Sequence, residues 1–127
     1  MSAEAEAVAR RLFESFNRGA EPEDVWTEDA VYNEDPRWPG AGVYRGRDEI
    51  VRCWIAYAEI FDEPLFTLTS AEAHDDRVLA TALFRGRVGE MPVEHEWGYV
   101  VVVRGGLVHS LTAYFDPEDA RAAFAGP

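Results

Sequence analysis

The chain has 127 residues, of which 47% are hydrophobic and 13% aromatic, and its formal net charge at pH 7 is −12. This length suits one domain with a sizeable core, and so high an apolar content argues against disorder. The negative charge repels phosphate backbones and anionic membranes, and the basic residues, all arginine, are scattered from Arg10 to Arg121. We therefore expect neither a nucleic acid nor a membrane as partner.

Several kinds of site and segment are absent from the sequence. Cys53 is the only cysteine, so no internal disulfide can form, and its apolar neighbours predict that it packs as a small hydrophobe. His74, His95 and His109 lack metal-ligand spacing and no glycine-rich phosphate loop is present, so we expect neither a metal nor a cofactor. No signal peptide or apolar run near the ~20 residues of a membrane span is present, which predicts a soluble, cytoplasmic protein.

The first half of the chain is predicted to be mainly helical. Apolar residues recur at helical spacing over about residues 3–18 and again over about 47–62, which predicts two amphipathic helices. Between them, residues 21–24 (EPED) predict a short helix, because acidic residues and proline are favoured in a first turn. Residues 30–33 are predicted to form a short strand, and the prolines and glycines within 34–45 predict a loop.

The second half is predicted to form four long antiparallel strands at residues 65–73, 78–88, 93–103 and 107–115, and a last helical turn then runs from 116 to 124. Helices followed by a run of antiparallel strands are typical of an α+β fold with the helices on one face of the sheet. Strands this long twist strongly, so a bent sheet wrapped on a long helix leaves a concave space between them.

Two parts of the sequence resemble a known family. The first is Thr27–Pro36 (TEDAVYNEDP) with Tyr44–Ile50 (YRGRDEI), and the second is His95–Tyr99 (HEWGY) with residues 105–108 (GGLV) and 113–116 (AYFD). In this order and spacing they resemble the SnoaL-like and ketosteroid isomerase-like branch of the nuclear transport factor 2 superfamily. The resemblance implies one domain over residues 1–127, with a cone-shaped, strongly bent antiparallel sheet wrapped around N-terminal helices and a pocket opening between them.

A homodimer is also implied, because members of this branch are often dimeric. The charged residues Arg85, Arg87 and Glu94 favour the same prediction, since they lie on long predicted strands with an outer face to cover.

Asp35 is the sharpest catalytic candidate that the resemblance implies. In ketosteroid isomerases, an aspartate in a Glu-Asp-Pro setting after the first strand removes the proton alpha to a carbonyl, and Glu34-Asp35-Pro36 resembles that setting. A base of this kind accelerates a reaction by about 10²–10⁴-fold. The alternative is an ordinary turn residue, because Asp before Pro is common in loops.

The family's oxyanion hole is matched less closely. It pairs a tyrosine of the first helix with a protonated aspartate on the penultimate strand. Here the first helix has no tyrosine and Leu12 or Arg11 stands near that place, while Tyr99 stands near the place of the aspartate. The Tyr99 hydroxyl is thus a candidate oxyanion donor. His95, two strand positions from Trp97 on the same face, is either an acid–base group or a satisfied, partly buried side chain.

A mainly aromatic ligand-binding surface is predicted around these groups. Its candidate residues come from both halves of the chain and are Asn33, Trp38, Trp54, Tyr57, Phe61, Trp97 and Phe115. The alternative is that they are simply core. Asp116 is either an acidic site residue, as in some cyclase-like relatives, or the N-cap of the last helix.

Two functions remain open on this basis. One is a cofactor-free isomerase or cyclase that acts on a small apolar carbonyl compound, with Asp35 as base and Tyr99 or His95 steadying the enolate. The other is a ligand-binding or dimeric scaffold domain without turnover. Fold-level resemblance alone does not choose between them.

Overall fold

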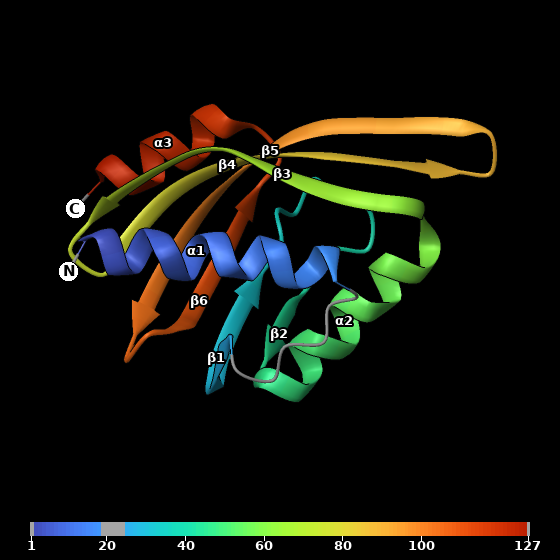
Figure 1. The fold of residues 1–127 in the computed structure, drawn as a ribbon. Helices are drawn as coiled ribbons and strands as arrows, with labels where there is room; N and C mark the ends of the chain where they lie inside the picture. Colours follow the sequence, from blue (N-terminus) through green and yellow to red (C-terminus); the bar gives the residue numbers. More distant parts are fainter. Residues whose placement is uncertain (1, 19–24, 127) are drawn as a thin grey trace.

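Three helices and a six-stranded sheet make up the part of the chain described by the computed structural model, residues 2–18 and 25–126 (Figure 1). The helices are α1 (Ser2–Asn17), α2 (Arg47–Ile60) and α3 (Pro117–Ala125). The strands are β1 (Trp26–Asn33), β2 (Val43–Arg45), β3 (Asp62–His74), β4 (Arg77–Val88), β5 (Met91–Arg104) and β6 (Leu107–Tyr114). The predicted α+β fold class is confirmed.

The strands lie in the order β2-β1-β6-β5-β4-β3. Every neighbouring pair is antiparallel except β1 and β6, which run parallel, so the first strand lies beside the last. Gly105 and Gly106 both have positive φ, as a two-residue hairpin turn between β5 and β6 requires. The paired ends of β4 and β5 project beyond the other strands at the right of Figure 1.

The inner face of the curved sheet packs against α1, which lies across the strands in Figure 1. Leu12 and Phe13 are almost fully buried there, and burying each side chain contributes roughly 1.5–3 kcal/mol. Phe16 meets the ring of Phe66 on β3 edge to face at 4.8 Å. α2 covers the other end of the same face beside β1 and β2, so the two helices leave a space between themselves and the sheet.

The last helix, α3, lies on the outer face, so the prediction that the helices share one face is wrong for this element. Ala120 of α3 is fully buried yet is no part of the inner core. Its neighbour in space is Gly98, on the side of β5 opposite Trp97 and Tyr99. A Cβ at Gly98 would lie 2.6 Å from the Ala120 Cβ and 2.7 Å from the Pro117 Cα. Glycine is therefore what allows α3 to pack so closely on the strand.

Replacing Gly98 by Ala is expected to lower the free energy of unfolding by about 2 kcal/mol, because backbone of α3 would have to move. Urea denaturation measures the change. Gly126→Ala is the matched control, since an added Cβ there meets only carbonyl oxygens at 3.5 Å and φ is −70°. Equal stability of the Gly98 variant and the control would contradict this account of α3 packing.

Of four other local predictions, one is not tested and three differ from the structure in the bounds or the number of elements. The predicted helix at 21–24 lies outside the described residues. β1 begins at Trp26 rather than at residue 30, because its first residues pair with β6 across an irregularity in the register. A short strand, β2, interrupts the predicted loop 34–45. β3 begins at Asp62 despite Pro64, which an edge strand tolerates.

Candidate functional site

A cavity of about 320 Å³ lies between the inner face of the sheet, α1, α2 and the segment that follows β1. Eleven of its sixteen lining residues are aromatic: Phe16, Tyr32, Trp38, Trp54, Tyr57, Phe61, Phe66, Phe84, Trp97, Tyr99 and Phe115. Its inner end includes Tyr99, which is 4% exposed, and its outer end includes Phe115, which is 37% exposed. The cavity is at the small end of the range for ligand pockets.

Glu34 places a carboxylate on this aromatic wall. It follows β1, and strand alternation directs it to the same side as the buried residues Ala30 and Tyr32. Both of its oxygens accept hydrogen bonds from neutral donors. The Gly42 N–H donates to Oε1 at 3.1 Å, and the Tyr57 hydroxyl of α2 donates to Oε2 at 2.5 Å. These bonds fix the carboxylate against the wall, and no cationic side chain of the described residues pairs with it.

Tyr99 and Tyr32 also line the cavity, near Glu34. Burial raises the pKa of Tyr99, and the negative charge of Glu34 raises it further. Burial likewise raises the pKa of Tyr32 well above its usual value. Both phenols therefore stay protonated at neutral pH. Within residues 2–18 and 25–126 no hydrogen bond engages either hydroxyl, so each is available to donate to an oxygen of a bound molecule.

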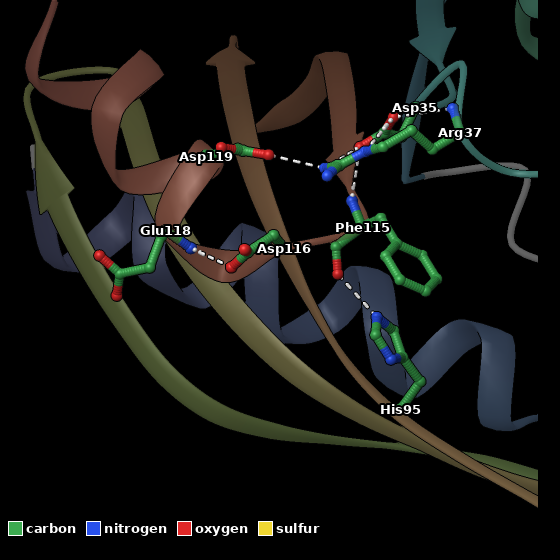
Figure 2. Close-up of polar contacts among 7 residues, drawn as sticks. All are labelled: Asp35, Arg37, His95, Phe115, Asp116, Glu118 and Asp119. Atoms are coloured by element: carbon green, nitrogen blue, oxygen red, sulfur yellow. Dashed lines mark hydrogen bonds and ion pairs between the residues drawn. The ribbon is translucent and has the colours of Figure 1, made fainter.

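Asp35, the predicted base, is 7% exposed and lies outside the set of described residues that line the cavity. Figure 2 shows its carboxylate turned to Arg37, whose Nη2 lies 2.9 Å from Oδ2 and whose Nε lies 3.2 Å from Oδ1. The Phe115 N–H also donates to Oδ2, at 2.8 Å. The bonds from the Arg37 guanidinium hold the pKa of Asp35 well below its usual range, against the opposing effect of burial. Asp35 is thus an ionised, fully engaged carboxylate.

Arg37 extends this network to α3 (Figure 2), because its Nη2 lies 2.6 Å from Oδ2 of Asp119. The Asp35 carbonyl accepts the Trp38 N–H at 2.9 Å, so the same residue shapes the turn that presents Trp38 to the cavity. We call Asp35, Arg37 and Asp119 the mouth clamp. It joins the segment after β1 to the outer helix and thereby holds Trp38 and Phe115 at the exposed end of the cavity.

His95 lies at the same end, with its ring stacked on Phe115 at 4.0 Å. Its Nε2 is 2.6 Å from the Phe115 carbonyl oxygen (Figure 2). A carbonyl only accepts, so Nε2 carries a proton in this arrangement. The Nε2 of His95 thus ties its ring to Phe115 on the cavity wall.

The structure brings together most of the predicted ligand-binding residues, since Trp38, Trp54, Tyr57, Phe61, Trp97 and Phe115 all line the cavity. Asn33 is the exception, because its Nδ2 lies 3.4 Å from the Thr112 hydroxyl on β6. Strand alternation explains the difference, since Asn33 points away from the side that Tyr32 and Glu34 share.

Glu34 is the chemical group that sequence reasoning missed. The alternation of Ala30 and Tyr32 on β1, continued to Glu34 just after the strand, was the signal that could have found it. The predicted N-cap at Asp116 is confirmed, because its Oδ1 accepts the Glu118 N–H at 2.9 Å (Figure 2). Burial raises the pKa of the Cys53 thiol to about 11, which fits a small hydrophobe rather than a reactive thiol.

No set of three or more His, Cys, Asp or Glu side chains is arranged to hold a metal ion in the described ranges 2–18 and 25–126. In the same ranges no helix is long and apolar enough to cross a bilayer.

The SnoaL-like domain family matches residues 9–111, well over half of the chain. The protein therefore belongs to the SnoaL-like family, as the resemblance in its sequence implied. No curated protein sequence matches it significantly.

Several solved structures share the fold. Bal32a, from a soil-derived mobile gene cassette, is 21% identical, with 97% of each chain covered and a TM-score of 0.78. A candidate SnoaL-like polyketide cyclase from Jannaschia sp. CCS1 is 14% identical over 100% of this chain and 95% of its own, with a TM-score of 0.76. A protein with a ketosteroid isomerase-like fold from Catenulispora acidiphila, solved with trimethylamine, is 15% identical over 94% and 93%, with a TM-score of 0.73.

Proposed function

We propose that the protein binds a small, largely apolar carbonyl compound in the aromatic cavity and moves a proton on it, with Glu34 as the base. The observation that carries this proposal is the position of Glu34, a carboxylate held by two neutral donors on a mostly aromatic wall. A carboxylate in such a cleft can take a proton directly from a bound C–H group. No cofactor is needed for this chemistry.

The proton transfer has two steps in this proposal. Glu34 first removes a proton alpha to the carbonyl, so that the electron pair of the C–H bond moves into an enolate. The protonated hydroxyls of Tyr99 and Tyr32 lie near Glu34 and can donate to the enolate oxygen, which stabilises the developing charge. Where the enolate is conjugated with a C=C bond, Glu34 then returns the proton to the far carbon of that system, giving an isomerisation. Alternatively, the enolate carbon attacks a second carbonyl of the same molecule, and the resulting alkoxide takes the proton back from Glu34, giving a cyclisation.

Asp35 stays the rival base, because the family resemblance points to it. Its bonds to Arg37 and Phe115 support a different part, in which it positions the mouth of the cavity. An ionised carboxylate with so lowered a pKa is also a weak base. We therefore assign the base to Glu34 and the positioning of the mouth to Asp35.

A second candidate function is ligand binding without turnover. The occupied oxygens of Glu34 favour it, because a carboxylate that already accepts two hydrogen bonds is well placed as a fixed counter-charge. Two of the proteins with the same fold support both functions at a coarse level. The Jannaschia protein is a candidate cyclase, and the Catenulispora acidiphila protein holds a small organic molecule.

Hydrogen–deuterium exchange distinguishes the two functions. Small aryl and cyclic ketones are incubated with the protein in deuterium oxide, and proton NMR follows the loss of the alpha-proton signals. Proton transfer by the protein predicts exchange that is faster than in buffer and saturates with ketone concentration. Saturable binding of the same ketones with no exchange above the buffer rate would leave the binding function and refute the enzyme.

The homodimer stays a prediction. All three residues that motivated it are already paired within the chain, because Arg85 Nε lies 2.8 Å from Glu94 Oε2 and Arg87 Nη2 lies 3.1 Å from Glu63 Oε1. Sedimentation that shows only a 14.3 kDa species would contradict the dimer. The cytoplasmic location is likewise a prediction.

A further inference from the structure

The formal charges that the described residues place on the cavity wall are all negative. With histidine counted as neutral, its only formally charged side chains among the described residues are Glu34 and Glu94, and no arginine lines the cavity in residues 2–18 and 25–126. Glu94 is exposed and is neutralised by Arg85, at 2.8 Å. Glu34 accepts only from the Gly42 N–H and the Tyr57 hydroxyl, neither of which carries charge. The cavity therefore contains one uncompensated negative charge.

Arg37, which lies beside Phe115 at the mouth, does not cancel this charge. The Arg37 guanidinium lies 5.8 Å from the centre of the Phe115 ring, but it is shared by two carboxylates, those of Asp35 and Asp119. One positive and two negative charges leave the mouth clamp with a net charge of −1. An anionic ligand would thus meet repulsion at the entrance as well as at Glu34.

The aromatic wall of the cavity also favours a bound cation. The face of an aromatic ring carries the negative part of its quadrupole, so rings that surround a cation stabilise it, and tryptophan does so best. Trp38, Trp54 and Trp97 are among the lining residues. The net charge of −12 also raises the local concentration of cations around an apolar cleft.

We propose that the cavity selects organic cations, namely small ammonium compounds with an apolar body, over neutral and anionic molecules of the same shape. Glu34 supplies the counter-charge, and the tryptophan and tyrosine rings surround the ammonium group. The proposal deepens the proposed function, because it names an ammonium-bearing carbonyl compound as the preferred substrate. It depends on the cavity and not on turnover.

Three probes of nearly the same shape test the selectivity: benzyltrimethylammonium, neopentylbenzene and phenylmethanesulfonate, which are cationic, neutral and anionic. Quenching of the fluorescence of the lining tryptophans reports binding. The cation is expected to bind about tenfold or more tightly than the neutral probe, and the anion is expected to show no saturable quenching. A neutral probe that binds as tightly as the cation, or an anion that binds at all, would overturn the proposal.

Two variants locate the charge. Glu34→Gln is expected to weaken cation binding about tenfold and to leave the neutral probe unchanged. Glu72→Gln removes the same charge at an exposed position of β3 outside the described cavity lining, and is expected to change neither. Equal losses in both variants would assign the effect to net charge and refute the site. The wild-type comparison remains decisive if Glu34→Gln does not fold.

The exchange experiment tests the proposed enzyme, and the probe experiment tests the cation selectivity, so each proposal can be refuted without the other. Cation selectivity without exchange of any ketone, an ammonium-bearing ketone included, refutes the proposed enzyme alone. Ketone exchange without cation selectivity refutes this inference alone.

Discussion

Replacing Glu34 by Gln is expected to slow alpha-proton exchange of a bound ketone by about 10²–10⁴-fold, because the amide cannot accept the proton. The substitution preserves the shape of the side chain and keeps an oxygen for the Gly42 N–H, so the fold should persist. The exchange rate per folded molecule, measured by NMR in deuterium oxide, gives the result. Binding of the neutral ketone should change little.

Asp35→Asn is the matched control, since it makes the same chemical change one residue along the chain. We expect it to reduce exchange only as far as it loosens the mouth of the cavity. If Asp35→Asn abolishes exchange in folded protein and Glu34→Gln does not, the base implied by the family resemblance is right and our assignment is wrong.

Asp35→Asn is expected to have a second large effect, a loss of about 2 kcal/mol in the free energy of unfolding near neutral pH. The buried carboxylate accepts bonds from the Arg37 guanidinium and the Phe115 N–H. An amide can accept only some of these bonds and presents its own N–H groups to the guanidinium. Urea unfolding, followed by tryptophan fluorescence, measures the loss.

The loss is expected to depend on pH in one direction. The folded-state pKa of Asp35 is lowered, so its contribution to stability is fully present above its unfolded pKa of ~3.9. As the pH falls below that value, the unfolded chain takes up a proton that the folded protein still excludes. The difference between the wild type and Asp35→Asn should therefore narrow at about pH 3. A difference that is constant or widens on acidification would contradict the arrangement at Arg37.

Asp29→Asn is the control for this measurement. Asp29 also pairs with an arginine, Arg104, but both side chains are exposed and solvent screens the pair. We expect Asp29→Asn to lower the free energy of unfolding far less than Asp35→Asn does.

Most of the fold could be predicted because one regular pattern decides each element. The alternation of β5 and the helical spacing of α1 both follow from the need to bury one face. The side of the sheet that α3 covers could not be predicted in this way. The position of α3 depends on the close approach of Gly98 to Ala120. A single glycine in a strand does not indicate which residue packs against it.

The site shows where a motif stops being informative. Glu34 and Asp35 are adjacent and directly follow β1, which ends at Asn33. The resemblance drew attention to Asp35, whereas the structure turns Glu34 to the cavity and Asp35 to Arg37. Arg37 and Asp119 are 82 residues apart in the chain. Because no local pattern relates residues at that distance, the mouth clamp could be seen only in three dimensions.

The clamp also gives the C-terminal helix an influence on ligand entry. Asp119 grips Arg37 from α3, while Phe115, just before that helix, forms part of the entrance. A truncation that ends before Pro117, or a bulky fusion that distorts α3, would remove the bond from Asp119 to Arg37, leave Arg37 bound to Asp35 alone, and so loosen the segment that carries Trp38. Recombinant versions of this protein are therefore best tagged at the N-terminus. In a version shortened at the C-terminus, we expect the entrance of the cavity to be wider and less selective than in the intact protein.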